Sequence, residues 1–131
     1  MDANGTMLRL RALHVMGHGS ARIACATGVS EQVIQRVTRG GSRTVSLAVR
    51  DAVARVYDLW WDLRAPERTG AERAAATKAR HRARRGDWCA GAALDDDRLD
   101  QPGYRPRHGW LPASGTGIAD QSGPTIWEGI G

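Results

Sequence analysis

Phenylalanine is absent from this chain of 131 residues, whose aromatic side chains are five tryptophans and two tyrosines. A hydrophobic core must therefore be built mainly from aliphatic side chains and alanine, with a few tryptophans. Lysine is nearly absent too, because Lys78 is the single lysine among 19 basic residues. The length fits one domain with at most an appendage.

Cysteine is also scarce, since Cys25 and Cys89 lie far apart and form no CxxC pair. Disulfide-held secreted domains have more cysteines at shorter spacings, so the pattern favours a reducing cytoplasm. No apolar run approaches the roughly 20 residues that a membrane-spanning helix needs. The N-terminus has an acidic residue, Asp2, at its start and two arginines, Arg9 and Arg11, where a signal peptide would be apolar. We therefore expect a cytoplasmic protein with no membrane partner.

Basic charge is concentrated in one segment of the chain, whose formal net charge is +5. Residues 64–85 contain eight basic and two acidic side chains, whereas residues 86–101 contain one basic and five acidic side chains. A basic block on a small domain favours a polyanionic partner, because neutralised phosphates release their counterions. The alternative is a solvated charged helix without a partner.

Five helices are predicted from the spacing of apolar residues, so we expect a small all-α domain. Residues 1–6 show no helical pattern and are expected to be frayed. A helix over 7–16 would bury its leucines and leave Arg9 and Arg11 exposed to solvent. The remaining predicted helices span residues 20–27, 30–38, 47–65 and 70–85.

The fourth predicted helix contains two neighbouring apolar stripes. The first is expected to face the core, and its members are Val49, Val53, Val56, Trp60 and Leu63. The second consists of Tyr57 and Trp61, and it has two interpretations. Either both side chains pack against the first helix or the chain after Pro66, or they form an interface with a partner.

The fifth predicted helix begins with a capping box, because Thr69 is followed three residues later by Glu72. Its small face, formed by alanines, is too thin for much of a core: Ala71, Ala75, Ala79 and Ala83. We therefore expect this basic helix mainly to contact nucleic acid. After Gly86 the chain is acidic and then rich in glycine and proline, which predicts a largely irregular tail.

The stretch from His18 to Gly41 is typical of a helix-turn-helix. Such a motif needs a small residue where its helices meet, a turn residue of positive φ, an apolar residue after it and a capped second helix. The residues that meet these needs in register are Ala24, Gly28, Val29 and Ser30. The expected inward residues are Ile23, Ile34 and Val37.

The outward side chains of the second motif helix suit DNA. Glutamine can bond adenine through two hydrogen bonds, arginine can do so with guanine, and glutamate can accept from cytosine. The candidates for base readout are Ser30, Glu31, Gln32, Gln35 and Arg36. The candidates for phosphate or minor-groove contacts are Arg39, Arg43, Lys78, Arg80, Arg82, Arg84 and Arg85.

The segment TGVSEQVIQRVTRG resembles the Cro/repressor-type helix-turn-helix family, and TVSLAVRDAVARVYDL resembles that family's next core helix. With GDWCAGAALDDDRLDQPGYRPR, the chain over about residues 7–107 is similar to small helix-turn-helix and immunity-repressor-like proteins of actinobacterial phages. The resemblance implies a transcriptional repressor. Thr27 stands where the family usually has leucine. This difference would remove about 1–3 kcal/mol of the stabilisation that a buried leucine side chain provides.

These patterns together predict four segments: a frayed N-terminus at 1–6, a helix-turn-helix domain at 7–65, a basic helix at 66–86 and an irregular tail at 87–131. The domain at 7–65 is expected to fold without the rest. The expected partner is double-stranded DNA in a bacterial host, bound by a homodimer or by a monomer with two modules. The expected action is promoter occlusion, and the alternative is a helical adaptor that uses Tyr57 and Trp61.

Catalysis, metal and cofactor binding are not expected. The acidic group at 95–97 and Asp100 lacks the ordered glycine and distal glutamate of a calcium loop, and could instead face the basic helix. His14 and His18 are four residues apart but belong to no HExxH motif.

Overall fold

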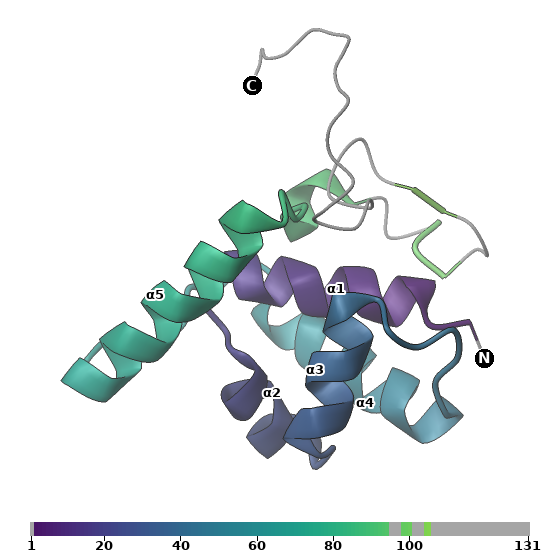
Figure 1. Ribbon diagram of the computed structural model, residues 1–131, viewed down its shortest axis with the longest axis horizontal. Helices are drawn as coiled ribbons and strands as arrows, with labels where there is room; N and C mark the ends of the chain where they lie inside the picture. The colour runs from purple at the N-terminus through teal and green to yellow at the C-terminus, as the bar shows by residue number, and fades with distance from the viewer. Residues whose placement is uncertain (1, 95–97, 101–103, 106–131) are drawn as a thin grey trace, which may run out of the picture.

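The computed structural model describes residues 2–94, 98–100 and 104–105. Within these ranges the chain is all-α, as predicted, and the only ladder pairing is an isolated bridge between Asp2 and Thr44. The elements shown in Figure 1 are α1 (Asn4–Val15), α2 (Ser20–Thr27), α3 (Glu31–Arg39), α4 (Leu47–Trp60), α5 (Gly70–Arg85) and the short 3₁₀ helix η1 (Gly91–Ala93). The predicted tail over 106–131 lies outside the described residues.

Helix α1 is the centre of the fold, because α3, α4 and α5 all pack against it. Leu8, Leu10 and Leu13 of this helix are at most 1% exposed. Ile23 of α2 and Val53 of α4 join the same core, with Ile34 and Val37 of α3.

The predictions for the N-terminal segment are wrong in two respects. Residues 2–6 are not frayed, since α1 begins at Asn4 and the Ala3 amide donates a 3.0 Å hydrogen bond to the Arg43 carbonyl. Arg9 and Arg11 are buried rather than exposed. The reason is tertiary: helices cover α1 on several sides, so it has no continuous solvent face.

The turn between α2 and α3 has the predicted geometry. Gly28 has a φ of 77°, in the left-handed region that glycine adopts at little cost. Ser30 caps α3, because its hydroxyl accepts a 3.3 Å hydrogen bond from the Val33 amide. Thr27 ties the same turn together: its hydroxyl donates to the Ile23 carbonyl at 2.8 Å and accepts from the Val29 amide at 3.2 Å.

Helix α4 ends at Trp60, five residues before the predicted end. Leu63 therefore leaves the core stripe and is 52% exposed. The capping box at Thr69 and Glu72 is present at the start of α5. The buried face of α5 consists of Ala76, Ala79 and Ala83, so the prediction for Ala71 and Ala75 is wrong.

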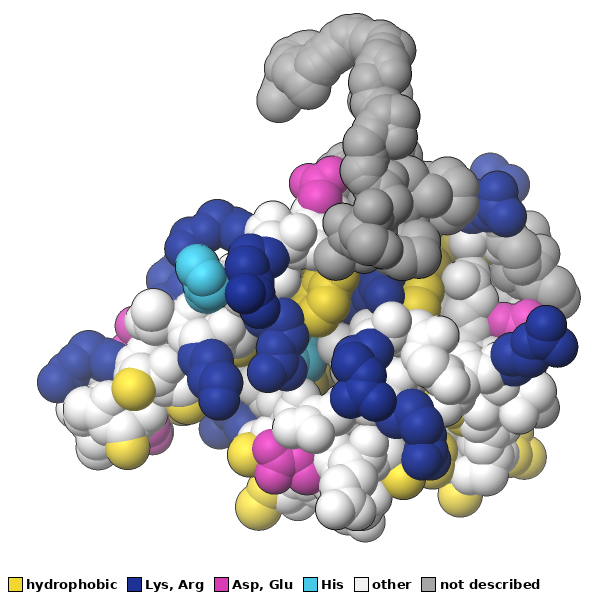
Figure 2. All heavy atoms as spheres, viewed as in Figure 1, with side chains coloured by type: hydrophobic (Ala, Val, Ile, Leu, Met, Phe, Trp, Pro, Cys, Tyr) yellow, Lys and Arg dark blue, Asp and Glu magenta, His cyan; other side chains and the backbone are white. Residues whose placement is uncertain are grey.

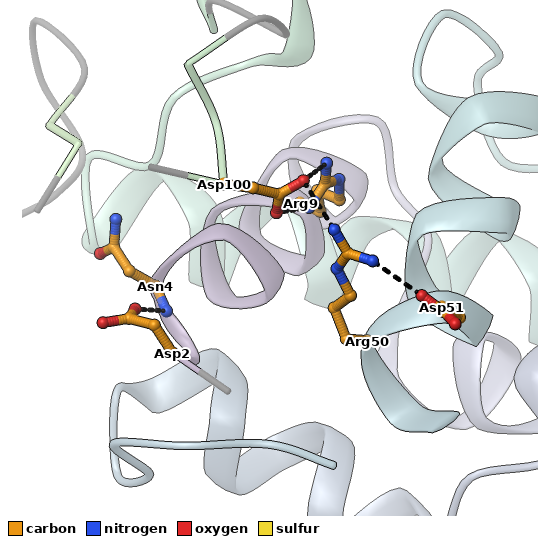
Figure 3. Close-up of polar contacts among 6 residues, drawn as sticks. All are labelled: Asp2, Asn4, Arg9, Arg50, Asp51 and Asp100. Carbon is orange, nitrogen blue, oxygen red and sulfur yellow. Dashed lines mark hydrogen bonds and ion pairs between the residues drawn. The ribbon is translucent and has the colours of Figure 1, made fainter. Parts of the chain in front are cut away.

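Residues beyond α5 return to the core. The Asp100 carboxylate accepts hydrogen bonds of 2.7 and 3.0 Å from Arg9 and lies 3.3 Å from a guanidinium nitrogen of Arg50 (Figure 3). Leu99 is fully buried, and the carbonyl of Tyr104 accepts a 2.8 Å bond from the Asn4 side chain. The core is therefore continuous across the expected boundary at residue 65.

Candidate nucleic-acid interface

Helix α3 presents a polar face to solvent. Glu31, Gln32, Arg36 and Arg39 are exposed, and Gln35 is half-buried. Two exposed or half-exposed pairs order this face: the Gln35 amide donates to Glu31 at 3.2 Å, and Arg36 Nε donates to the Ser42 hydroxyl at 3.2 Å. Bonds of this kind between surface side chains contribute little to stability, so DNA groups can replace them.

Ser30 has a different role from the other candidates for base readout. Its hydroxyl is engaged in the cap of α3, where it accepts from Val33. The cap leaves the amides of the first helical turn pointing out of the helix start, which is the arrangement that favours phosphate. Ser30 thus sets the entry of α3, whereas residues from Glu31 onward provide the outward side chains.

Basic side chains lie on both sides of α3. Figure 1 shows α5 on one side and the 40–46 loop on the other, and Figure 2 shows Lys and Arg side chains gathered over α5 and α3 on this face. Arg43 in the loop is exposed. The sequence candidates for base and phosphate contacts from α3, from the loop and from part of α5 are therefore brought to one surface.

The basic side chains of α5 do not all share this surface. Lys78, Arg82 and Arg85 line two hollows whose other wall comes from α3. Arg80 points elsewhere, because its guanidinium lies 3.2 Å from the Glu67 carboxylate and also approaches Gly17. Arg84 is exposed and lines neither hollow. The sequence predicts the same phosphate-contacting role for all five basic residues of α5 in the candidate set. In the structure three of them line the hollows and two do not.

The larger hollow, of about 570 Å³, separates α3 from the C-terminal half of α5. We name it the α3–α5 groove, and its lining residues are Arg11, Gln35, Thr38, Arg39, Arg82, Arg85 and Trp88. No carboxylate is among them. The smaller hollow, of about 180 Å³, continues toward the start of α3 and includes Glu31, Lys78 and Arg82 in its lining.

Arg11 is a site residue that the sequence reasoning missed. It is 4% exposed, its Nε donates a 2.8 Å hydrogen bond to the Thr38 carbonyl, and its guanidinium carbon lies 5.2 Å from the centre of the Trp88 ring. Burial lowers the pKa of Arg11 from its ordinary value. The helical pattern of 7–16 contains no signal for this burial, because the cause is the packing of α3 and α5 against α1.

Of the two interpretations of Tyr57 and Trp61, packing is correct for Tyr57, and the alternative that makes this residue part of an interface is wrong. Its side chain is 2% exposed and belongs to the core, because this face of α4 turns toward α1. Trp61 is 37% exposed and remains available.

The histidines and acids of the described residues form no metal centre. Among these residues there is no group of three or more His, Cys, Asp and Glu that could hold an ion. His14 Nδ1 lies 2.9 Å from the Leu10 carbonyl and His18 Nε2 lies 2.8 Å from the Leu63 carbonyl, so each ring donates one hydrogen bond to the backbone. Asp100 pairs with Arg9 and Arg50 rather than with the basic helix, and residues 95–97 lie outside the described ranges.

Comparison with known proteins identifies no relative of this chain. No protein-family model matches the chain, and no curated protein or solved structure matches it either. None of the helices in the described ranges is both long and apolar enough to cross a bilayer. The interpretation of the surface therefore depends on its own geometry and charge.

Proposed function

We propose that this protein is a sequence-specific double-stranded DNA-binding regulator of transcription, a repressor that acts by occluding a promoter. The observation that supports this proposal is the setting of α3. It follows a left-handed glycine turn, is capped by Ser30, and presents Glu31, Gln35 and Arg36 between two basic flanks.

In the proposed complex α3 enters the major groove. That groove is about 12 Å wide and admits one α-helix, whose outward glutamine and arginine side chains can each bond a base through two hydrogen bonds. Gln32, Gln35 and Arg36 supply these contacts, and Glu31 accepts from a cytosine amino group. Because inward Ile34 and Val37 fix the rotation of α3 in the core, the outward set keeps one register.

The flanks of α3 supply affinity that a single helix lacks. A lone helix-turn-helix buries little surface, so useful binding needs a second contact on the same DNA or a second subunit. In this proposal Arg43 on one side and Lys78, Arg82 and Arg85 of α5 on the other contact the phosphates that border the groove. Protein bound in this way blocks access of polymerase to the promoter in the bacterial cytoplasm.

A second candidate function is docking of another protein at the end of α4. Leu59, Trp61 and Leu63 are close in sequence and are 66%, 37% and 52% exposed, and exposed large apolar side chains are a feature of interfaces. This site lies on another part of the chain from the polar face of α3. It corresponds to the adaptor alternative, without Tyr57.

Selection of bound sequences from random duplex DNA with the purified full-length chain tests the proposal. The expected result is enrichment of one motif, and its symmetry reports stoichiometry: an inverted repeat indicates a dimer, and one asymmetric site indicates a monomer. A pool that stays random after several rounds, together with a low salt dependence of binding, would contradict DNA recognition.

A further inference from the structure

The position of α5 relative to α3 is fixed by the core. Helix α5 packs against α1, and Ala76, Ala79 and Ala83 on its inner face are at most 4% exposed. Gly17 favours the close approach of α5, because a Cβ there would lie 2.7 Å from an Arg80 guanidinium nitrogen and 3.3 Å from the Cβ atoms of Ala65 and Ala76. Side chains on α5 therefore stand at a constant separation from the polar face of α3.

Trp88 anchors the other end of α5. Its amide donates a 2.9 Å hydrogen bond to the Ala83 carbonyl, and its ring meets the His14 ring edge-on at 5.5 Å between centres. The same ring faces the Arg11 guanidinium. The C-terminal half of α5, which contains Arg82 and Arg85, is thus held against α1 at the edge of the α3–α5 groove.

The charge that faces the α3–α5 groove is unbalanced. Lys78, Arg82 and Arg85 follow one another at spacings of four and three, which places them on one face of α5. Within the described residues, Arg39, Arg82 and Arg85 have no ion-pair partner, whereas Arg80 on another face is paired with Glu67. With Arg11 at its floor, the groove gathers four guanidinium groups, and no carboxylate is among the described residues that line it.

A phosphate group fits this arrangement better than a base does. An α-helix with its side chains is about 10–12 Å across, and the major groove is about 12 Å wide, so a groove filled by α3 has no room for α5. A helix held beside α3 must then lie over the sugar-phosphate backbone. Guanidinium forks match phosphate oxygens through paired hydrogen bonds.

We propose that the α3–α5 groove seats the phosphodiester backbone of the strand that borders the major groove entered by α3. Arg82 and Arg85 grip it from α5, and Arg39 grips it from the end of α3. This inference depends on the proposed function and deepens it, because one protomer then provides both the recognition helix and the backbone grip. Glu31 lines only the smaller hollow, so the grip is confined to the end of the groove at Arg39.

The test compares two double variants of equal charge in the full-length chain. Arg82→Ala/Arg85→Ala removes the groove pair, and Arg73→Ala/Arg84→Ala removes two exposed arginines of the same helix. Binding to the selected duplex and to a scrambled duplex is titrated at several salt concentrations. We expect the groove variant to reduce the slope of log affinity against log salt by about two and the control by less than half of that. The ratio of affinities for the two duplexes should stay unchanged in both variants.

Phosphate ethylation interference locates the contact. The wild-type chain should be blocked by ethylation on both borders of the site, and the groove variant should lose the interference on one border only. Equal slopes for the two double variants, or interference unchanged in the groove variant, would overturn the grip while leaving DNA recognition intact. A wild-type chain that does not distinguish the two duplexes would instead refute the proposed function. Thermal unfolding of each variant confirms that it is folded.

Discussion

The Nε–H of Arg11 donates a 2.8 Å hydrogen bond to the carbonyl oxygen of Thr38, which joins the central helix α1 to the last turn of α3. Carbonyls in a last helical turn lack partners within their own helix, and a cation there also complements the helix dipole. Arg11 thus satisfies a backbone group of the proposed recognition helix from inside the fold. The same guanidinium contributes positive charge to the floor of the α3–α5 groove.

Replacement of Arg11 should therefore destabilise the fold. Arg11→Ala leaves the buried Thr38 carbonyl without this donor and removes packing against Trp88. We expect a loss of about 2 kcal/mol in the free energy of unfolding, the usual scale for a buried hydrogen bond to a charged group. Urea denaturation measures it. Arg39→Ala, at an exposed position of the same groove, should stay within about 0.5 kcal/mol of wild type. Equal effects of the two substitutions would contradict this role.

Substitution of Gly28 isolates the cost of the left-handed turn. A Cβ at this position would meet nothing within 4 Å, so a side chain causes backbone strain without a clash. Gly28→Val should lower the free energy of unfolding by about 1–3 kcal/mol. Gly28→Asn is the matched control and should cost less, because asparagine tolerates the left-handed region. Thermal unfolding of both variants checks the order, and equal melting temperatures would contradict it.

Acid should weaken the fold through His14. Burial lowers the pKa of His14 to about 4, and the nearby charges of Arg82 and His18 add to this effect. The unfolded chain binds this proton near pH 6.5, so stability is full above that pH and falls as pH decreases from 6.5 toward 4. Between pH 7 and pH 5 the expected loss from this residue is about 2 kcal/mol.

Urea denaturation at the two pH values measures this loss. His14→Gln removes this titrating group and should reduce the pH dependence, whatever its stability at pH 7; the part that remains belongs to His18, whose pKa burial also lowers. His81→Gln, at an exposed position of α5, is the control and should leave the wild-type dependence in place. A wild-type stability that is the same at pH 5 and pH 7 would show that His14 is accessible to protons in the folded chain.

Local chemistry explains which parts of this fold the sequence predicts. Gly28, Ser30 and the Thr69–Glu72 capping box act through groups within a few residues of each other, so their roles can be recognised without tertiary information. The inward set of α3 is likewise visible as a helical stripe. These signals are enough for the all-α class and for the identity of the turn.

Burial of α1 explains what the sequence could not predict. A helix covered on several sides has no polar stripe, and its arginines are stabilised by partners far along the chain: Asp100 for Arg9 and Thr38 for Arg11. Tertiary packing also explains why Arg82 and Arg85 line the α3–α5 groove whereas Arg80 pairs with Glu67. The position of each arginine depends on which face of α5 is buried, and that face is the one formed by Ala76, Ala79 and Ala83.

Truncation tests this dependence on distant residues. The expectation from sequence is that residues up to 65 fold alone. In the structure, that fragment would lose the cover that α5 and Leu99 provide and leave Arg9 without Asp100. We now expect a fragment of residues 1–66 to show no cooperative thermal transition, and a fragment of residues 1–105 to unfold cooperatively by circular dichroism. A sharp transition in the shorter fragment would show that α5 is dispensable for the fold.

The division of labour on the proposed DNA surface gives the last prediction. Gln35 belongs to the outward face of α3, and its amide donates a 3.2 Å hydrogen bond to the Glu31 side chain. Because this bond joins two surface side chains, the Gln35 amide can leave it and turn toward a base without disturbing the core. Gln35→Ala should reduce discrimination at one base pair of the selected site by about 1–3 kcal/mol, roughly 5- to 150-fold. Arg85→Ala should weaken binding to selected and scrambled duplexes by the same factor, because phosphate contacts contain no sequence information. Titration of both duplexes with both variants separates the two roles. If Gln35→Ala weakens both duplexes equally, α3 is not the recognition helix, and Trp61→Ala becomes the variant with which to examine the docking alternative.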